Sequence, residues 1–178
     1  MAGRPAVTVS NVNSYLLVLG EREAIGWVLH EQRMAFPATR RPELDRLAIG
    51  DQLFVYATRG AWRNPSRDRG RIIAIAAVAS LVHRFDLPIE VAGREFHSGC
   101  RIRIDRIVPY PGGVELQPLV GRMNAFPKPE SWSVYLRRTL LPLPGEDAAV
   151  VSGAVEPLLR PRRDALRTYD TATQKSSP

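Results

Sequence analysis

The stretch Gly50-Asp-Gln-Leu-Phe-Val-Tyr-Ala-Thr58 joins a turn to a short run of strand-forming residues. Its first two residues favour a tight turn, and the run from Gln52 to Thr58 is rich in the apolar and aromatic side chains that suit a buried strand. Upstream, the apolar run Ser14–Leu19 has the length of a strand and stops at a glycine. We therefore expect short buried strands at the centre of the fold.

Strand patterns continue along the chain. Arg71–Leu81 is rich in β-branched residues, and its alanines permit close packing, although alanine is equally compatible with a helix. Ile89–Val91 and Glu95–Phe96 predict a hairpin that turns at Ala92-Gly-Arg94. Arg101–Val108 alternates isoleucine with charged residues, which predicts a strand with one buried face and one solvated face.

Helices are expected between and after these strands. Glu21–Glu31 places apolar residues at helical spacing behind early acidic residues, which predicts an amphipathic helix. Ser131–Leu140 is expected to be a helix with its first serine as the N-cap. Gly145–Leu159 is predicted to be a last helix, interrupted near Gly153 and Pro157.

The remaining segments are shorter or more polar. Pro42–Leu47 predicts one helical turn, and Val114–Leu119 predicts a short strand. Met34–Arg41 is expected to be a loop, and so is Arg59–Gly70, which holds arginines, glycines, a proline and a tryptophan. Arg160–Pro178 is polar and ends in serine and threonine, so we expect a basic, disordered tail.

These elements predict an α+β fold, namely a small, partly closed mixed β-barrel with peripheral helices. The length of 178 residues fits one domain, which we place at residues 13–159, after an N-terminal extension at 1–12 and before the tail at 160–178. No apolar run approaches the roughly 20 residues of a membrane-spanning helix, and residues 1–10 lack the apolar core of a secretory signal. We expect a cytoplasmic protein with no membrane partner, and the oligomeric state stays open.

Arginine supplies nearly all of the positive charge. The chain has 25 Lys and Arg against 18 Asp and Glu, which gives a net charge of +7, and Lys128 and Lys175 are its only lysines. Guanidinium can bind phosphate through two hydrogen bonds, so this excess favours nucleic acid, DNA or RNA, as the partner. A high-GC genome produces the same arginine bias without a functional reason, and this alternative stays open.

The sequence offers little catalytic or metal-binding chemistry. With Cys100 as the one cysteine, neither an intramolecular disulfide nor a cysteine zinc cluster can form. His97-Ser98-Gly-Cys100 places a base near two nucleophiles, but neighbours in a strand point to opposite faces. No glycine-rich phosphate loop is present. We therefore expect a protein that is not an enzyme and that needs no cofactor and no metal.

A distinctive order of segments spans about residues 13–143. Its members are Tyr15-Leu-Leu-Val18, Phe36-Pro37, Leu47-Ala-Ile-Gly-Asp-Gln-Leu-Phe-Val-Tyr56, Ile72-Ile-Ala-Ile-Ala-Ala-Val78 and Ser131-Trp-Ser-Val-Tyr-Leu-Arg-Arg138. The order resembles that of the EVE domain, and the Gly-Asp-x-Leu-x-x-Tyr element is its most specific part. The EVE family belongs to the PUA-like superfamily and is similar to the YTH and ASCH domains, which implies a link to modified bases in RNA or DNA.

The resemblance implies a pocket between the barrel and its helices, in which a base stacks on aromatic side chains and is hydrogen-bonded at its edge. The residues that correspond by position are Asn11, Asn13, Ser14, Phe36, Tyr56, Thr58 and Trp62. Many relatives carry tryptophan where Phe36 stands, and the loop Arg59–Gly70 is longer and more basic here. The pocket is therefore expected to be shallower, or to be closed by Trp62.

Arginines close to these residues in the sequence are expected to contact the phosphate backbone. They are Arg40, Arg41, Arg59, Arg63, Arg67 and Arg69, with Arg137 and Arg138 as further candidates for the same groove. Structural roles compete with these assignments: the asparagines suit turn caps, Trp62 suits a loop anchor, and Tyr56, Trp27 and Trp132 suit the core.

The sequence thus predicts a non-catalytic domain that binds nucleic acid, holds a modified or unmodified nucleobase in an aromatic pocket and contacts the backbone through arginines. Two other classes stay open. An enzyme acting on RNA or nucleotides would need His83 or His97 in the pocket, beside a carboxylate such as Asp86 or Asp105. A protein-interaction module would use an exposed Trp132 helix or the basic tail.

Overall fold

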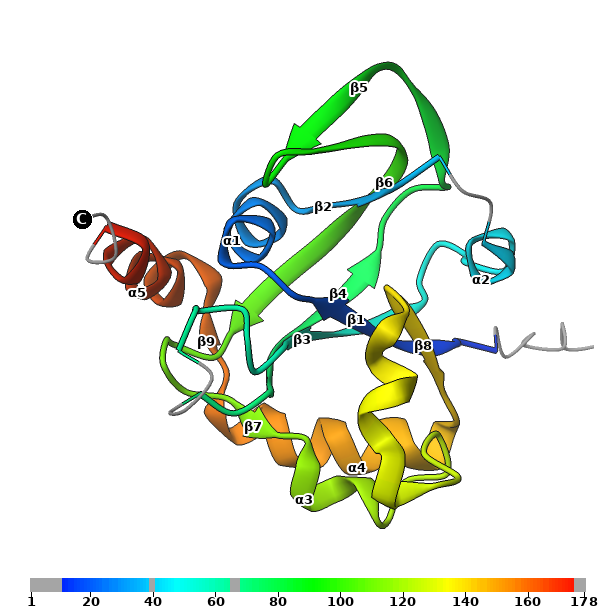
Figure 1. Cartoon of the computed structure of the whole chain (residues 1–178), viewed down its shortest axis with the longest axis vertical. Helices are drawn as coiled ribbons and strands as arrows, with labels where there is room; N and C mark the ends of the chain where they lie inside the picture. The colour runs from blue at the N-terminus through cyan, green and yellow to red at the C-terminus, as the bar shows by residue number, and fades with distance from the viewer. Residues whose placement is uncertain (1–10, 39–40, 65–67, 175–178) are drawn as a thin grey trace, which may run out of the picture.

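A mixed sheet that curls into a half-barrel forms the centre of the molecule (Figure 1). The computed structural model describes residues 11–38, 41–64 and 68–174, and for 172–174 the backbone only. The strands are β1 (Ser14–Leu19), β2 (Arg33–Phe36), β3 (Gln52–Ala57), β4 (Arg71–Val78), β5 (His83–Val91), β6 (Arg94–Ile107), β7 (Val114–Glu115), β8 (Leu140–Leu143) and β9 (Arg160–Pro161). The helices are α1 (Arg22–Glu31), α2 (Pro42–Asp45), α3 (Gln117–Val120), α4 (Gly145–Val155) and α5 (Arg162–Gln174), with the 3-10 helices η1 (Pro129–Arg137) and η2 (Glu156–Leu158).

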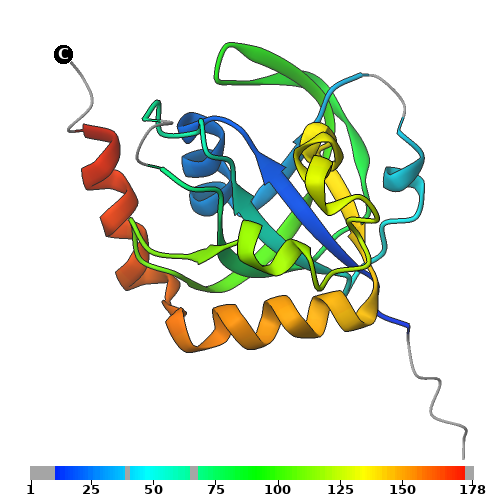
Figure 2. The ribbon, with the colours of Figure 1, turned by 60° about the horizontal axis from the view of Figure 1, so that its bottom comes forward.

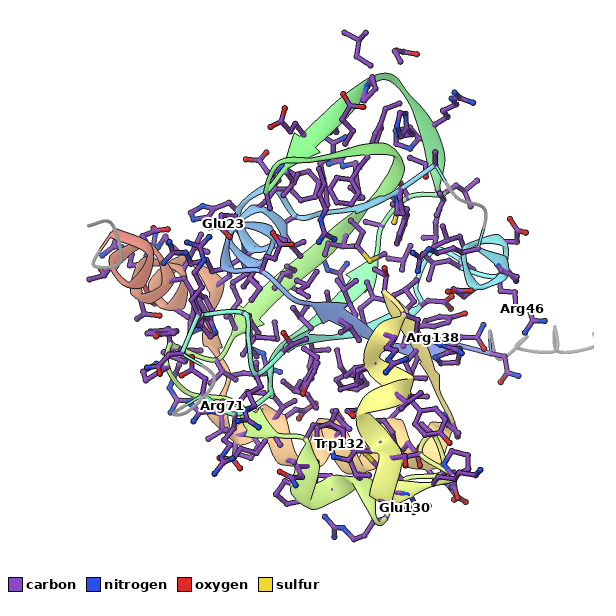
Figure 3. The ribbon with its side chains drawn as sticks, in the orientation of Figure 1. Glu23, Arg46, Arg71, Glu130, Trp132 and Arg138 are labelled. Atoms are coloured by element: carbon purple, nitrogen blue, oxygen red, sulfur yellow. The ribbon has the colours of Figure 1, made fainter. Side chains whose placement is uncertain are left out.

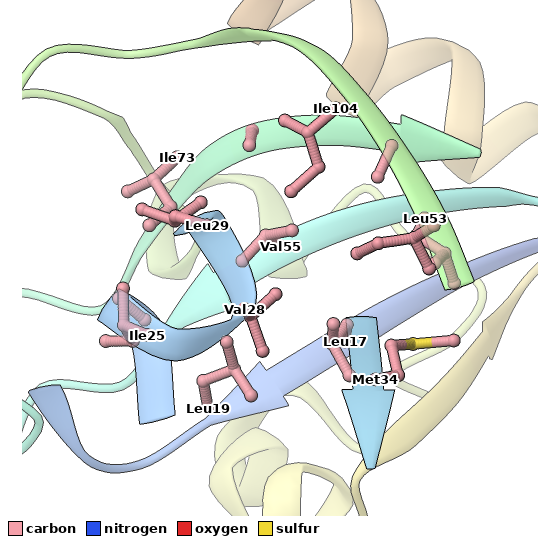
Figure 4. Packing of buried hydrophobic residues seen from close by; sticks show 14 of the residues in the cluster. Leu17, Leu19, Ile25, Val28, Leu29, Met34, Leu53, Val55, Ile73 and Ile104 are labelled. Atoms are coloured by element: carbon pink, nitrogen blue, oxygen red, sulfur yellow. The ribbon is translucent and has the colours of Figure 1, made fainter. Parts of the chain in front are cut away.

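The strands follow the order β2-β6-β4-β3-β1-β8 across the sheet. β1 and β3 form a parallel pair, in register from Ser14 opposite Gln52 to Leu19 opposite Ala57, and the other ladders are antiparallel. β6 is 14 residues long: its first half pairs with β2 and β5, and its second half with β4 and β9. β6 thereby carries β2 round towards β1, and Figure 4 shows Met34 of β2 close to Leu17 of β1.

β1 and β3 are buried on both faces, which explains their continuous apolar sequences. Because alternate residues of a strand point to opposite faces, Leu17, Leu53 and Val55 point into the half-barrel, where α1 covers them (Figure 4). Phe54 and Tyr56 belong to a second core on the outer face, which also holds residues of α3 and α4. Figure 2 shows α4 lying along this outer side of the sheet.

A buried carboxylate holds the turn before β3. Asp51 is 2% exposed and accepts hydrogen bonds from the backbone N–H of Asn13 at 3.1 Å and of Ala48 at 2.9 Å. Gly50 adopts a φ of +93°, which suits glycine and strains other residues. The Gly-Asp pair therefore has a structural role, because it ties the start of β1 to the start of β3.

The C-terminal segment is helical, and the prediction of a disordered tail from Arg160 is wrong over the described residues. α5 buries Ala165 and Tyr169, and the Tyr169 ring lies 6.0 Å from the Trp62 ring and 5.7 Å from the Tyr110 ring. The Tyr169 hydroxyl donates a hydrogen bond of 2.7 Å to a backbone carbonyl at the end of β6. The prediction failed because the segment is polar overall. A helix can still bury one apolar face with only a few apolar residues at helical spacing.

α5 also holds the end of α1. The Arg162 guanidinium donates hydrogen bonds to the carbonyl oxygen of Leu29, at 2.8 and 3.0 Å, and to that of His30, at 2.8 Å. The last carbonyls of a helix have no partner inside it, so Arg162 satisfies groups that would otherwise need water. In addition, His30 Nε2 lies 2.7 Å from a carboxylate oxygen of Asp170.

Two predicted segments have a different secondary structure. Met34–Arg41 begins with β2 instead of a loop, because Met34 and Phe36 are buried where this strand pairs with β6. Val114–Leu119 is a strand only for its first two residues, and α3 begins at Gln117.

The two later helices also differ in detail. The predicted helix Ser131–Leu140 is the 3-10 helix η1, which has Lys128 as its N-cap and Ser131 inside it with a non-helical backbone. Leu140 already belongs to β8. α4 runs through Gly153 without interruption and passes into η2 before Pro157.

The other predicted strands and the first helix are confirmed. The strand at Arg71 is β4, the hairpin at Ala92 is formed by β5 and β6, and Glu21–Glu31 contains α1. In β6 the isoleucines at 102 and 104 are buried, and the charged residues between them are exposed. No helix in the described part of the chain combines the length and the apolar character needed to cross a bilayer.

Tyr169→Ala should destabilise the protein, because it removes a buried ring together with its hydrogen bond. We expect the free energy of unfolding, measured by urea denaturation, to fall by about 3–5 kcal/mol. Arg167→Ala, at an exposed position of the same helix, is the matched control and should change it by less than about 0.5 kcal/mol. An unchanged stability of Tyr169→Ala would show that α5 does not support the fold.

Cys100 should be unreactive in the folded protein. Its side chain is 1% exposed, and burial raises the pKa of the thiol to about 11. Since the thiolate is the reactive form, only about one molecule in 1,000 is ionised near pH 8. We expect a disulfide reagent to modify Cys100 at the rate of unfolding, and at once in guanidinium. Fast labelling of the folded protein would contradict this assignment.

Candidate functional site

A cavity opens where β1 and β2 face each other across the open side of the half-barrel. Its volume is about 340 Å³, within the range of about 300–1,000 Å³ that is common for small-ligand sites. α1 forms one side and the β5–β6 hairpin forms another. We call it the seam cavity, and its lining includes Leu19, Gly20, Glu21, Trp27, Arg94, Phe96 and Thr139.

Two half-buried aromatic residues, Trp27 and Phe96, give the seam cavity its planar surfaces. α1 turns its most apolar side chains into the core, which leaves Trp27 on the flank of the helix, at the cavity. The Arg33 guanidinium lies 5.9 Å from the centre of the Trp27 ring, a cation–π contact outside the cavity lining. These walls are suited to stacking on a flat ring.

An ion pair between Glu21 and Arg94 spans the rim of the cavity, with 3.2 Å between carboxylate oxygen and guanidinium nitrogen. Glu21 is the N-cap residue of α1, where the positive end of the helix dipole favours a carboxylate. Both side chains are more than a third exposed, so the pair contributes only about 0–1 kcal/mol. A ligand can therefore replace either partner at low cost.

The tip of the β5–β6 hairpin positions Arg94 and Phe96. Ala92 and Gly93 have φ values of +53° and +73°, as in the two-residue turns whose twist matches that of the flanking strands. Residues two apart in a strand share a face, which is why both Arg94 and Phe96 reach the cavity.

None of the seven residues that the resemblance implied for the base pocket lines the seam cavity. Phe36 is fully buried, and Asn11 is exposed. Asn13 and Ser14 lie at the other end of β1, where the Ser14 hydroxyl donates a hydrogen bond of 3.2 Å to the side chain of Gln52.

The other three candidates lie on β3 or in the loop that follows it. Tyr56 is buried in the outer core, and this burial raises its pKa to about 12. Tyr56 and Thr58 line a cavity on the outer side of the sheet. Trp62 packs on Tyr110, with ring centres 4.9 Å apart, and on Tyr169. This packing gives Trp62 the role of a loop anchor.

The predicted arginines separate into groups. Arg41 lies with Arg46 and Arg138 in a groove of about 690 Å³, which we call the arginine groove. Figure 3 shows Arg46 and Arg138 on the same side of the molecule. The Nε atom of Arg41 is buried and has no hydrogen-bond partner among the described residues. Arg138 directly precedes Thr139 of the seam cavity, so the groove and the cavity are neighbours.

The remaining arginines belong to the loop between β3 and β4. Arg59 and Arg69 line the outer cavity of Tyr56 and Thr58. Arg63 forms an ion pair of 2.8 Å with Glu23 of α1, which is labelled in Figure 3. Arg40 and Arg67 lie outside the described residues.

Sequence reasoning missed the residues that line the seam cavity. Trp27 was assigned to the core and does pack against the inner core, but it also lines the cavity. Its position beside the apolar stripe of α1 was the available signal. Arg94 and Phe96 follow a predicted hairpin turn at a spacing of two, which places them on one face. Arg94 and Phe96 lie near Glu21 and Trp27 only because the sheet curls. Local sequence patterns do not predict that curl.

The histidines that a catalytic site was expected to use do not lie in the seam cavity. His83 and His97 lie on β5 and β6, and neither lines it. The His83 ring instead packs edge-on against Phe85, with ring centres 5.5 Å apart. Cys100 is buried. Among the residues described, no group of three or more His, Cys, Asp or Glu is arranged to hold a metal ion.

No protein-family model matches the sequence, and no curated protein matches it. Solved structures do match the fold. Protein Rpa0253 from Rhodopseudomonas palustris is 16% identical, with a TM-score of 0.51 over 83% of this chain and 95% of that chain. The YTH domain of Zygosaccharomyces rouxii MRB1, in complex with N6-methyladenosine RNA, is 13% identical, with a TM-score of 0.51 over 79% of this chain and 85% of that chain.

Human THYN1, in complex with DNA containing 5-methylcytosine, is 12% identical, with a TM-score of 0.50 over 79% of this chain and 96% of that chain. At such low identity these matches show the architecture that the chains share. The chain therefore shares the α+β fold of the YTH domain and of THYN1, and this is the fold that the resemblance of its sequence predicted.

Proposed function

We propose that the chain is a non-catalytic nucleic-acid-binding domain that holds one nucleobase, modified or unmodified, in the seam cavity. The observation that carries the proposal is the presence of Trp27 and Phe96 in a cavity at the open side of the barrel. The fold supports it, since two similar structures are complexes with RNA containing N6-methyladenosine and with DNA containing 5-methylcytosine.

A nucleobase matches the chemistry of the seam cavity. Every base has a face that stacks on aromatic side chains, and each such contact contributes about 1–3 kcal/mol. At the rim, the Glu21 carboxylate can accept hydrogen bonds from an exocyclic amino group, while Arg94 and Thr139 can donate to ring nitrogens or carbonyl oxygens. The walls would hold the base and the rim would recognise its edge.

The recessed position of the cavity favours single-stranded or flipped nucleotides. A base inside a duplex is stacked on both faces, so it must leave the stack before side chains can contact those faces. The cost of unstacking is smallest for a base that is already unpaired. We therefore expect single strands to bind more tightly than duplexes of the same sequence.

The arginine groove is the proposed contact for the phosphate backbone. β1 connects it to the seam cavity, because Tyr15 lines the groove and Val18 lines the cavity. Three residues of a strand span about 10 Å, so a nucleic-acid strand bound along β1 can reach both sites. One strand could thus place a base in the cavity and its flanking phosphates on Arg41, Arg46 and Arg138.

Phe96→Ala and Trp27→Ala should each weaken binding to single-stranded oligonucleotides by about 1–3 kcal/mol, because each removes a stacking surface. Fluorescence anisotropy with labelled strands, with and without methylated bases, measures the affinities. Phe85→Ala is the matched control, since this residue is also half-buried on the hairpin but does not line the cavity. Wild-type affinity in both cavity variants would exclude the seam cavity as the base site.

Arg138→Gln should weaken binding by a similar factor for every sequence tested, because phosphate contacts carry no base information. The slope of the logarithm of affinity against the logarithm of salt concentration should become shallower by about 1. Arg163→Gln, at an exposed position of α5, is the control and should leave the slope unchanged. A slope that stays the same in Arg138→Gln would remove this residue from the phosphate path.

A further inference from the structure

A second cavity lies on the outer face of the sheet, between η1 and β3. It has a volume of about 490 Å³, and we call it the η1 cavity. Its lining includes Tyr56, Thr58, Arg59, Arg69, Gln117 and Trp132. From its residue types we infer that the η1 cavity is a second binding site, which takes a nucleotide: a planar ring together with its phosphate.

The aromatic surface of this cavity is Trp132, which is half-buried. Its ring packs edge-on against Phe126 of the outer core, with ring centres 6.3 Å apart at an interplanar angle of 80°. Figure 3 shows Trp132 on the side of η1 that is turned towards Arg71. An anchored ring that keeps part of its surface exposed is suited to stacking on a base.

The charges of the cavity suit a phosphate. Arg59 and Arg69 contribute two positive charges from the β3–β4 loop, against one carboxylate, that of Glu115. Arg69 is exposed, so its guanidinium can reach an anion without unpacking the core. Guanidinium binds phosphate oxygens in pairs, which makes arginine well suited to this contact.

Polar groups for the edge of a ring surround the same space. Gln117 offers an amide donor and acceptor, and Thr58 and Ser133 offer hydroxyls. Tyr56 forms part of the lining, and a side chain at residue 70 would collide with its ring and hydroxyl, so Gly70 leaves room for it. A tyrosine hydroxyl is protonated at neutral pH, and burial raises the pKa of Tyr56 further, to about 12, so this group can donate a hydrogen bond.

The two cavities meet at the carboxyl ends of β1 and β3. The N–H of Thr58 donates a hydrogen bond of 3.0 Å to the carbonyl of Leu19, and a Cβ at Gly20 would lie 3.9 Å from the Thr58 hydroxyl. Leu19 and Gly20 line the seam cavity, whereas Thr58 lines the η1 cavity. The nucleotide in the η1 cavity is either a free mononucleotide or one nucleotide of the strand that is bound at the seam cavity. Only the second of these cases rests on the proposed function.

The test is a calorimetric titration of wild type, Arg69→Gln and Trp132→Ala with adenosine monophosphate, cytidine monophosphate and inorganic phosphate. If the nucleotide is free, wild type binds a mononucleotide more tightly than phosphate, and each variant loses about tenfold or more in affinity. Arg163→Gln, at an exposed position of α5 that lines neither cavity, is the matched control and keeps wild-type mononucleotide affinity.

If the nucleotide belongs to a strand, mononucleotides bind weakly, and both η1 variants lose about fivefold to tenfold in affinity for a single-stranded oligonucleotide. If only Trp27→Ala loses affinity for the oligonucleotide, the second site is overturned and the proposed function stands. If only the two η1 variants lose affinity, the proposed function of the seam cavity is overturned and the second site stands. Mononucleotides that bind no more tightly than phosphate, together with wild-type oligonucleotide affinity in both η1 variants, would also overturn the second site. Should Trp132→Ala lose its circular-dichroism signal, the exposed Arg69→Gln carries the test alone.

Discussion

The parallel pairing of β1 with β3 is the constraint on which the rest of the molecule depends. Asp51 fixes the start of the pair through its hydrogen bonds to the backbone of Asn13 and Ala48. With the register set, both strands end at the same edge of the sheet, and Gly20 and Thr58 lie side by side there. The two strands also separate the inner core from the outer core. Each cavity borders one of these cores, and both reach this shared edge.

Local patterns were sufficient for most of the sheet. Continuous apolar runs marked the strands that are buried on both faces, and strict alternation marked the half-solvated end of β6. Local patterns failed where the secondary structure of a segment depends on a distant partner. β2, for example, is a strand because it pairs with β6. α5 has a small apolar face on a polar helix, which composition alone assigns to disorder.

The candidate site was harder to predict than the fold. Its residues come from the start of α1, from the flank of that helix and from the tip of a hairpin some 70 residues later, as the numbers of Glu21, Trp27 and Arg94 show. Only the curl of the sheet brings them together. The arginine excess pointed to a class of partner, but several arginines are paired with carboxylates, such as Arg63 with Glu23 and Arg103 with Asp105. Net charge therefore could not locate the contact surface.

The hydrogen bonds from Arg162 to the end of α1 join segments that are more than 130 residues apart in the chain. α1 carries Trp27, so the last helix supports a wall of the seam cavity without touching its contents. A substitution of Arg162 would remove these hydrogen bonds and so act on that wall from a helix that does not line the cavity. Changes at the C-terminal helix could in this way reshape the cavity while all the residues that line it stay the same.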